Sequence, residues 1–225
     1  MSRREKQPTS RTQGPGAVGE TREKGNLDRP TIVRTALALL DEVGVDGLST
    51  RRLAAELGIK SASLYWHFKD KNELLNEMSG VLFEEALLPL PPNVDGPDFD
   101  WAEWLADGCR AIRRSALSRR DGAQVMARPR PRAPNAKVSF EDNVKTLMRS
   151  GLTDMESRLT MQTLRRYAIG AALQEQATPA HSGSGGIVVA GAEGFEFGLQ
   201  TFLDGLKSRI AEREKVGRSL RKSRG

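Results

Sequence analysis

The chain has 225 residues and a formal net charge of +6. That length can bury a sizeable hydrophobic core without disulfides or a structural metal. The single cysteine, Cys109, cannot form an internal disulfide, and the first residues lack the apolar segment of a secretion signal, so we expect a cytoplasmic protein. No run of about 18 apolar residues is present, so we expect no membrane partner. The basic excess suits a polyanionic partner, although it supports solubility equally well.

The N-terminal part changes character after residue 26. Residues 1–26 mix Arg, Lys, Gly, Ser, Thr and Pro without apolar periodicity, which predicts a flexible basic arm. A first helix follows, in which Asp28 is the expected N-cap and Gly44 the expected stop. Its apolar residues recur with a helical period at Ile32, Ala36, Leu39, Leu40 and Val43.

Two short amphipathic helices come next, separated by Gly58. Ser49 or Thr50 can cap the first of them, and Ser61 is expected to cap the second. This arrangement is typical of a helix-turn-helix, in which the second helix enters the major groove of DNA. Since consecutive helical residues point about 100° apart, two turns cannot bury three adjacent rings, and at least one of Tyr65, Trp66 and His67 must face outward.

The rest of the chain also gives helical patterns. Asp70 with Glu73, and Thr153 with Glu156, form capping boxes at the starts of two longer helices. A proline-rich stretch at 89–97 separates the front of the chain from these later helices. No strand pattern competes, so the predicted fold class is all-α.

Residues 27–75, with GLSTRRLAAELGI, LYWHF and the K-x-K that follows, resemble the DNA-binding head of the TetR family of bacterial transcriptional regulators. SRRDGAQVM at 118–126 and ALQEQ at 172–176 are similar to the tetracycline-repressor type of effector domain. The resemblance implies an N-terminal three-helix helix-turn-helix head joined to a C-terminal helical ligand-binding and dimerisation domain at 76–214, followed by a basic tail at 215–225.

The resemblance also implies which side chains meet DNA. Phosphate contacts fall on Thr50, Tyr65 and Lys71, a base-reading arginine on Arg51, base-edge positions on Ser61, Ala62 and Ser63, and base or backbone contacts on Trp66 and His67. An arginine at such a position can bond guanine O6 and N7 together. Hydroxyl groups and a lysine mainly fix position and add salt dependence.

By the same resemblance, the second domain contains an effector cavity. The candidate effector-binding residues are Trp101, Trp104, Ile112, Met126, Phe140, Val144, Leu147 and Gln174. Where the tetracycline-repressor type has a His and a Glu for a magnesium-chelated drug, this chain has Met126 and Gln174. A thioether is a poor Mg²⁺ ligand, so we expect no metal, no cofactor and an effector other than magnesium-tetracycline. Plain core packing is the competing interpretation of Trp101 and Trp104.

The sequence therefore predicts a homodimeric repressor that binds a pseudo-palindromic operator and is released by a small, mostly apolar effector. The resemblance implies that, in the dimer, the helix at 154–174 and the last long helix pair with their copies, and the expected contacts are Phe195, Leu199, Phe202 and Leu206. The alternative is a TetR-like DNA-binding regulator without a small-molecule effector, or an activator. An enzyme is not expected, because the sequence offers no nucleophile–base pair, paired carboxylates or metal cluster.

Overall fold

The computed structural model of the chain describes residues 27–86, 94, 96, 98–128, 140–177 and 191–222, and all of its regular secondary structure in these ranges is helical. The all-α prediction is confirmed. The predicted arm at 1–26 and most of the glycine-rich stretch at 183–191 lie outside the described residues. The helices are α1 (Arg29–Gly47), α2 (Thr50–Glu56), α3 (Ser61–Leu64), α4 (Lys71–Ala86), α5 (Trp101–Leu117), α6 (Gly122–Met126), α7 (Phe140–Arg149), α8 (Asp154–Ala177) and α9 (Gly191–Lys222).

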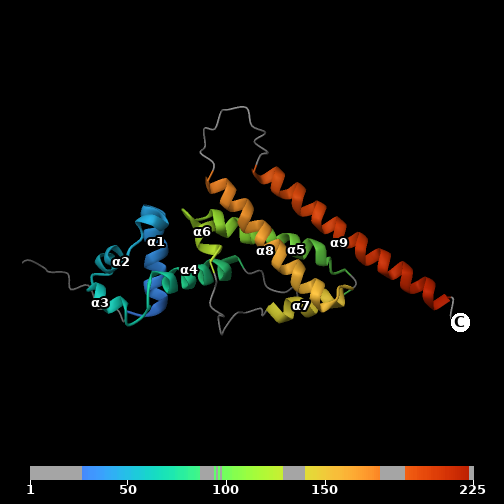
Figure 1. Cartoon of the computed structure of the whole chain (residues 1–225), viewed down its shortest axis with the longest axis horizontal. Helices are drawn as coiled ribbons and strands as arrows, with labels where there is room; N and C mark the ends of the chain where they lie inside the picture. The colour runs from blue at the N-terminus through green and yellow to red at the C-terminus, as the bar shows by residue number, and fades with distance from the viewer. Residues whose placement is uncertain are drawn as a thin grey trace, which may run out of the picture.

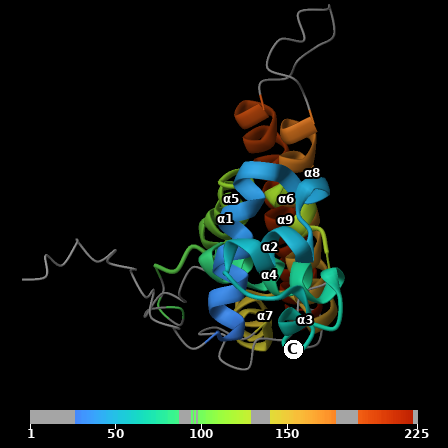
Figure 2. The same ribbon diagram turned by 90° about the vertical axis from the view of Figure 1, so that its left-hand side faces the viewer.

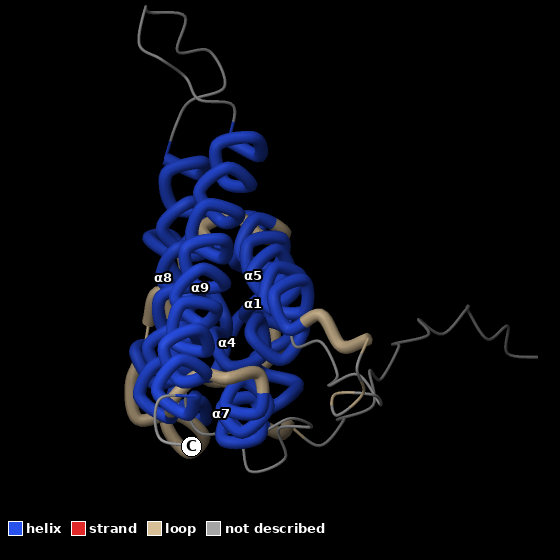
Figure 3. Tube along the Cα trace, turned by 90° about the vertical axis from the view of Figure 1, so that its right-hand side faces the viewer, coloured by secondary structure: helices blue, strands red, loops and turns tan. Residues whose placement is uncertain are grey.

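The helices form a small head and a larger body. In Figure 1 the head, α1 to α3, lies at one end, α4 leads from it into the body, and α9 runs along the far side toward the C-terminus. Figure 2 looks onto the head, with α2 and α3 toward the viewer. Figure 3, from the opposite end, shows α8 and α9 side by side. No helix in the described ranges combines the length and apolarity needed to cross a bilayer.

Side-chain caps begin several of these helices, as predicted. Thr31 N donates to Asp28 Oδ1 at 2.8 Å, and Arg52 N donates to Ser49 Oγ at 3.3 Å. Ser61, however, is not a cap: Lys60 holds the N-cap position of α3 and makes no side-chain cap bond. The prediction for Ser61 is wrong because Ser61 is already the first helical residue of a helix with one turn.

The capping box predicted at Thr153 and Glu156 forms in full. Of the box predicted at Asp70 and Glu73, only the bond to Asp70 forms, because the Glu73 carboxylate accepts from Lys69 N instead. Glu73 N donates to Asp70 Oδ1 at 2.9 Å. At the start of α8, Thr153 N donates to Glu156 Oε2 at 2.9 Å, and Glu156 N donates to Thr153 Oγ1 at 3.3 Å. These bonds satisfy backbone donors that a helix start otherwise leaves without partners.

The core has two parts. One joins the head to α4, α6 and the C-terminal part of α8, and the other joins α5, α7, α8 and α9. In the second part, Phe195 and Leu199 are 3% and 0% exposed. These two side chains are packed inside their own subunit, so the prediction that they form a dimer interface is wrong, whereas Phe202 and Leu206 are only half-buried.

Candidate nucleic-acid interface and effector cleft

A tight turn at Gly58 joins α2 to α3. Gly58 has φ +66°, in the left-handed region that glycine adopts without strain. Gly58 N donates to Ala55 O at 3.1 Å, and Ile59 N donates to Ala54 O at 2.9 Å. This pair of bonds satisfies the last carbonyls of α2 and sends the chain back across it. Leu53 and Ala54 face the core, which fixes α2 beneath α3.

The residues of α3 and its C-terminal turn divide into inward and outward sets. Leu64 and Phe68 are 3% and 5% exposed, whereas Tyr65 and Trp66 are 58% and 90% exposed. The prediction that not all the rings are buried is confirmed. We call the residues outside the core the recognition rim; Ala62, Tyr65 and Trp66 are exposed, and Ser61, Ser63 and His67 are half-buried. A large ring that is almost fully exposed offers a flat apolar surface to a partner.

Arg29 braces this rim from behind. Its Nη1 donates to the carbonyl of His67, and its Nη2 lies 2.9 Å from Glu73 Oε1 and 2.8 Å from Glu77 Oε1. The guanidinium also stacks 4.4 Å from the centre of the Phe68 ring. One side chain at the start of α1 therefore fixes the end of the recognition turn against the start of α4.

Glu73 takes part in both the brace and the local cap. Lys69 N donates to its Oε2 at 2.7 Å. This backbone bond, followed by the bond from Arg29, lowers the pKa of Glu73 below its usual value. The charged form of Glu73 is thus favoured where the recognition turn meets α4.

The predicted DNA contacts outside the recognition rim lie at the starts of helices. Thr50 is the first residue of α2 and is half-buried, and Arg51, which follows it, is exposed. Lys71, the first residue of α4, donates from Nζ to Val45 O at 2.7 Å. An ammonium group has three donors, so this bond leaves two for a phosphate.

A loop between α5 and α6 docks onto the C-terminal end of α1. Asp121 Oδ2 accepts from Val45 N at 2.8 Å. Asp121 has φ +55° and is the one residue other than glycine with a left-handed backbone among the described residues. Gly44, with φ +69°, kinks α1 at this point, and a Cβ there would lie 2.6 Å from Asp121 Oδ2. The left-handed backbones of Gly44 and Asp121 allow the loop to approach the helix closely.

Two arginines strengthen the same junction. Arg119 Nη1 lies 2.7 Å from Asp41 Oδ2, and Arg120 N donates to Asp41 Oδ1 at 3.1 Å. Arg120 Nη1 also donates to Glu42 O at 2.8 Å. Head and body are therefore connected by a continuous set of hydrogen bonds in addition to α4.

The end of α8 holds this loop from the other side. Gln176 Nε2 donates to Ala116 O at 3.1 Å and to Arg119 O at 2.8 Å, while its Oε1 accepts from Ala123 N at 3.1 Å. A motion of α8 would thus be passed to the loop that contacts α1.

The predicted effector residues are spread over the two parts of the core. Met126 and Leu147 are 0% exposed and Val144 is 1% exposed. Gln174 is exposed, and Trp101, Trp104, Ile112 and Phe140 are half-buried. Met126 packs with the head, whereas Trp101, Trp104 and Leu147 pack around α9. Ile112 contacts both parts.

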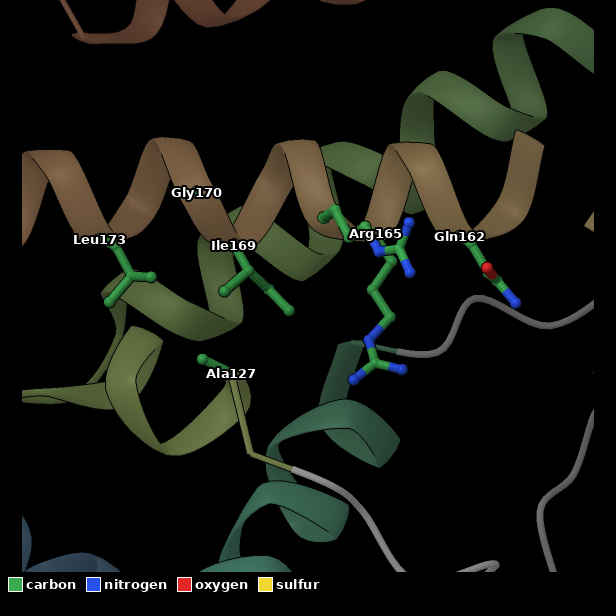
Figure 4. A pocket seen from close by; sticks show the side chains of 7 residues that line it. Ala127, Gln162, Arg165, Ile169, Gly170 and Leu173 are labelled. Atoms are coloured by element: carbon green, nitrogen blue, oxygen red, sulfur yellow. The ribbon is translucent and has the colours of Figure 1, made fainter. Parts of the chain in front are cut away.

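A cleft of about 450 Å³ lies between α8 and the end of α6. In Figure 4, Arg165 reaches from α8 across this cleft, and Ala127 faces Ile169 and Leu173. The lining residues are Ala127, Gln162, Arg165, Arg166, Ile169, Gly170 and Leu173. None of the predicted effector residues is among them, although Met126 and Gln174 are sequence neighbours of Ala127 and Leu173. In the described ranges, no group of His, Cys, Asp and Glu is placed to hold a metal ion.

Comparison with known proteins agrees with this architecture. Residues 32–78 match the family model for bacterial regulatory proteins of the tetR family, and residues 92–186 match the tetracyclin repressor-like C-terminal domain. The class A tetracycline repressor of transposon 1721 from Escherichia coli is 34% identical over 81% of this chain and 92% of that repressor. The chain belongs to the TetR family. It is a helix-turn-helix DNA-binding transcription regulator.

Solved TetR-family structures share its fold. TetR-Q116A from Acinetobacter baumannii AYE, in complex with minocycline, is 31% identical with a TM-score of 0.71, over 82% of this chain and 98% of that one. ActR from Streptomyces coelicolor, in complex with (S)-DNPA, is 30% identical with a TM-score of 0.68, over 83% of this chain and 100% of that one. Both relatives were thus solved with a small molecule bound.

Sequence reasoning missed two groups of residues in this TetR-family chain. Arg29 was not identified because its partners lie more than 35 residues away, as with His67 at a separation of 38. Arg165 and Arg166 were not identified because the predictions for α8 concerned its capping box, its pairing in the dimer and Gln174. The signal available for the second pair was two consecutive cations in a helix that also carries apolar residues.

Proposed function

We propose that this chain is a TetR-type transcriptional repressor that binds a pseudo-palindromic operator as a homodimer and leaves it when a small, mostly apolar effector binds. The observation that carries the proposal is the recognition rim. Trp66 is 90% exposed in the turn that follows α3, between Leu64 and Phe68, which lie in the core. A monomeric protein gains nothing from exposing such a ring, whereas a DNA partner would cover it.

The side chains of the head have separate roles in this proposal. Arg51 reads a guanine, and the small rim residues Ser61, Ala62 and Ser63 meet base edges in the major groove. Thr50, Tyr65 and Lys71 contact phosphates, which fixes the register of the helix on the duplex. Trp66 and His67 contact either bases or the sugar-phosphate backbone.

A homodimer is supported by apolar side chains that the single chain leaves open. Met155 and Leu159 on α8 are 64% and 52% exposed, and Phe197 on α9 is 77% exposed. Figure 3 shows these two helices side by side. Pairing α8 and α9 with their copies would cover these side chains. The two heads would then bind half-sites about 34 to 36 Å apart, or a multiple of that spacing.

Release would follow from a shift between two dimer states. The cleft contacts α8 and the end of α6, and the α5–α6 loop beside them holds Val45 in the head. An effector that binds better to one arrangement of these helices changes the population of that arrangement. In the other arrangement the heads would no longer match the half-site spacing.

Selection of bound duplexes from a random DNA pool tests the proposal. The expected result is a two-fold related consensus, bound by a species that sedimentation measures as two chains. Compounds that release the selected duplex then identify the effector. A consensus without two-fold symmetry would argue against the homodimer, and the absence of any retarded DNA at low ionic strength would refute the function.

A further inference from the structure

Val45 connects the body of the protein to a predicted DNA contact. Its N–H donates to Asp121 Oδ2 at 2.8 Å, and Asp121 belongs to the α5–α6 loop of the body. Its carbonyl accepts from Nζ of Lys71, a predicted phosphate contact, at 2.7 Å. Val45 is 8% exposed, so its backbone polar groups need partners within the protein. One buried residue therefore carries a hydrogen bond to the body and another to the DNA-binding surface.

The residues after Gly44 form a separate turn at the end of α1. Gly44 has φ +69° and interrupts the helix, and a Cβ at this position would lie 2.6 Å from Asp121 Oδ2. The Asp121 carboxylate thus contacts the chain at the kink that separates Val45 from the rest of α1. Because such a short turn gains little stability from its own hydrogen bonds, we expect its orientation to depend on this carboxylate.

Lys71 depends on acceptors outside its own helix for its position. It is the first residue of α4, where the positive end of the helix dipole disfavours a cation. The Val45 carbonyl offsets this effect by accepting from the ammonium group. Since the lysine stem is flexible, loss of that carbonyl would spread the ammonium over many rotamers before it meets a phosphate.

A second contact leads from the cleft to the neighbour of Lys71. Arg128 Nη1 donates to Asn72 Oδ1 at 3.2 Å, and Asn72 follows Lys71 on α4. Arg128 itself follows Ala127, which lines the cleft. Asp121 precedes α6 and Arg128 follows it, so both ends of this short helix contact segments that position Lys71. A shift of α6 changes both contacts together.

We propose that Asp121 is a positioning residue for DNA binding: through Val45 it holds the Lys71 ammonium where a phosphate of the half-site meets it. The inference rests on the proposed function, because that function supplies the phosphate. It adds that the body controls affinity within each head as well as the spacing of the two heads. An effector that moves α6 withdraws Asp121 and weakens one phosphate contact in each subunit.

Two substitutions at Asp121 test this role. Asp121→Gly removes the acceptor and still fits the left-handed backbone, which has φ +55°. Operator affinity should fall about fivefold, the size expected for one hydrogen bond, and the slope of log affinity against log salt should fall by up to about 1. Loss of a negative charge by itself favours a polyanion, so this fall opposes the general charge effect. Asp121→Asn keeps an oxygen acceptor and tolerates the same backbone, so it should restore most of the affinity.

The matched control is Asp41→Ala, which removes the bonds to Arg119 and Arg120 at the same junction but does not touch Val45. It removes the same charge and should not weaken DNA binding. In a Lys71→Met background, Asp121→Gly should cause no further loss, because both residues act through one contact. An undiminished further loss in that background, or an equal loss with Asp41→Ala, would overturn the assignment.

A duplex with a single half-site distinguishes this effect from a change in the spacing of the heads. The loss caused by Asp121→Gly should persist on that duplex, because it arises within one head. A loss confined to the full operator would show that Asp121 acts only through the spacing, and would overturn the proposal.

Amine labelling with acetic anhydride tests the tie without DNA. Mass spectrometry of the full chain should show slower acetylation of Lys71 than of the exposed Lys69. Asp121→Gly should raise the rate at Lys71 about fivefold and leave Lys69 unchanged. Equal rates at Lys71 in the wild type and the variant would overturn the inference while operator binding stands. If the labelling is as expected and no duplex is retarded, the proposed function is refuted, and the role of Asp121 in DNA binding with it.

Discussion

The head and the body both present side chains to solvent, but they support these side chains differently. α3 has 4 residues and no side-chain cap, so contacts from α1 and α4 hold the recognition rim in place. α8 has 24 residues and a complete capping box, and it positions Arg165 and Arg166 through its own backbone.

This difference indicates where mutations act at a distance. A short helix gains little stability from its own hydrogen bonds, so its orientation depends on tertiary contacts. Loss of a distant brace should therefore alter DNA binding without removing a DNA contact. In the cleft, by contrast, exposed side chains should be replaceable without changing the fold. Four predictions test this contrast, from the largest expected effect to the smallest.

The largest expected effect is a loss of stability on truncation of Met126. The side chain is 0% exposed and packs in the core that joins head and body. Met126→Ala should lower the free energy of unfolding by about 2 to 5 kcal/mol, because it leaves a cavity. Met126→Leu, which conserves volume, should cost less than about 1.5 kcal/mol. Urea unfolding followed by circular dichroism measures both changes.

The matched control is Met148 on α7, which is 44% exposed. Met148→Ala should change stability by no more than about 0.5 kcal/mol. If Met126→Ala instead leaves stability unchanged and weakens effector binding alone, Met126 is a ligand contact, as the resemblance implied, and its role in the core is minor.

Variants of Arg51 and Lys71 test base reading and phosphate binding separately. Arg51→Ala should reduce discrimination at one base pair by about 1 to 3 kcal/mol. Lys71→Ala should weaken binding to all sequences alike and lower the slope of log affinity against log salt by about 1. Titrations of operator and random duplexes at several salt concentrations measure both. Equal losses on the two duplexes for Arg51→Ala would remove that residue from base readout.

Much of the head could be predicted because its signals are local. The caps at Asp28 and Ser49 each join residues that are three apart, so sequence spacing is enough to find them. The outward direction of Trp66 followed from the angle between consecutive residues of a helix. The prediction that Ser61 caps α3 was wrong by one position, because helix boundaries are the least certain part of such predictions.

The cleft and the junction could not be predicted in this way, since they join distant segments. Arg29 and Glu73 are 44 residues apart, and Val45 and Asp121 are 76 apart. Helical periodicity predicts that Ile169 faces inward, but it does not indicate which helix lies opposite. The effector residues taken from the family resemblance therefore await the ligand experiments, whereas the resemblance itself identified the correct family.

Arg29 tests whether the brace matters for recognition. Arg29→Ala removes the bonds to His67 O, Glu73 and Glu77 without removing a predicted DNA contact. Operator affinity should fall about tenfold, or about 1.4 kcal/mol, because the recognition turn becomes less ordered. The control Arg34→Ala removes an exposed arginine of α1 that bonds only Thr31 among the described residues. A loss equal to that of Arg34→Ala would show that the brace is not needed.

The smallest effect concerns the tie between α8 and α9. Backbone donation from Thr153, followed by the bond from Arg213, lowers the pKa of Glu156 to about 2. Because the folded pKa lies below the unfolded value of 4.5, the contribution of Glu156 to stability is complete above that value and is lost as pH falls toward 2. Glu156→Gln should therefore lower stability by at most about 1 kcal/mol at pH 7, since the pair is near the surface. The difference from the wild type should shrink steadily below about pH 4 in urea titrations.

The control is Glu212→Gln, at an exposed position on α9, which should show no such pH dependence. A parallel response of the two variants would assign the effect to net charge rather than to the α8–α9 tie.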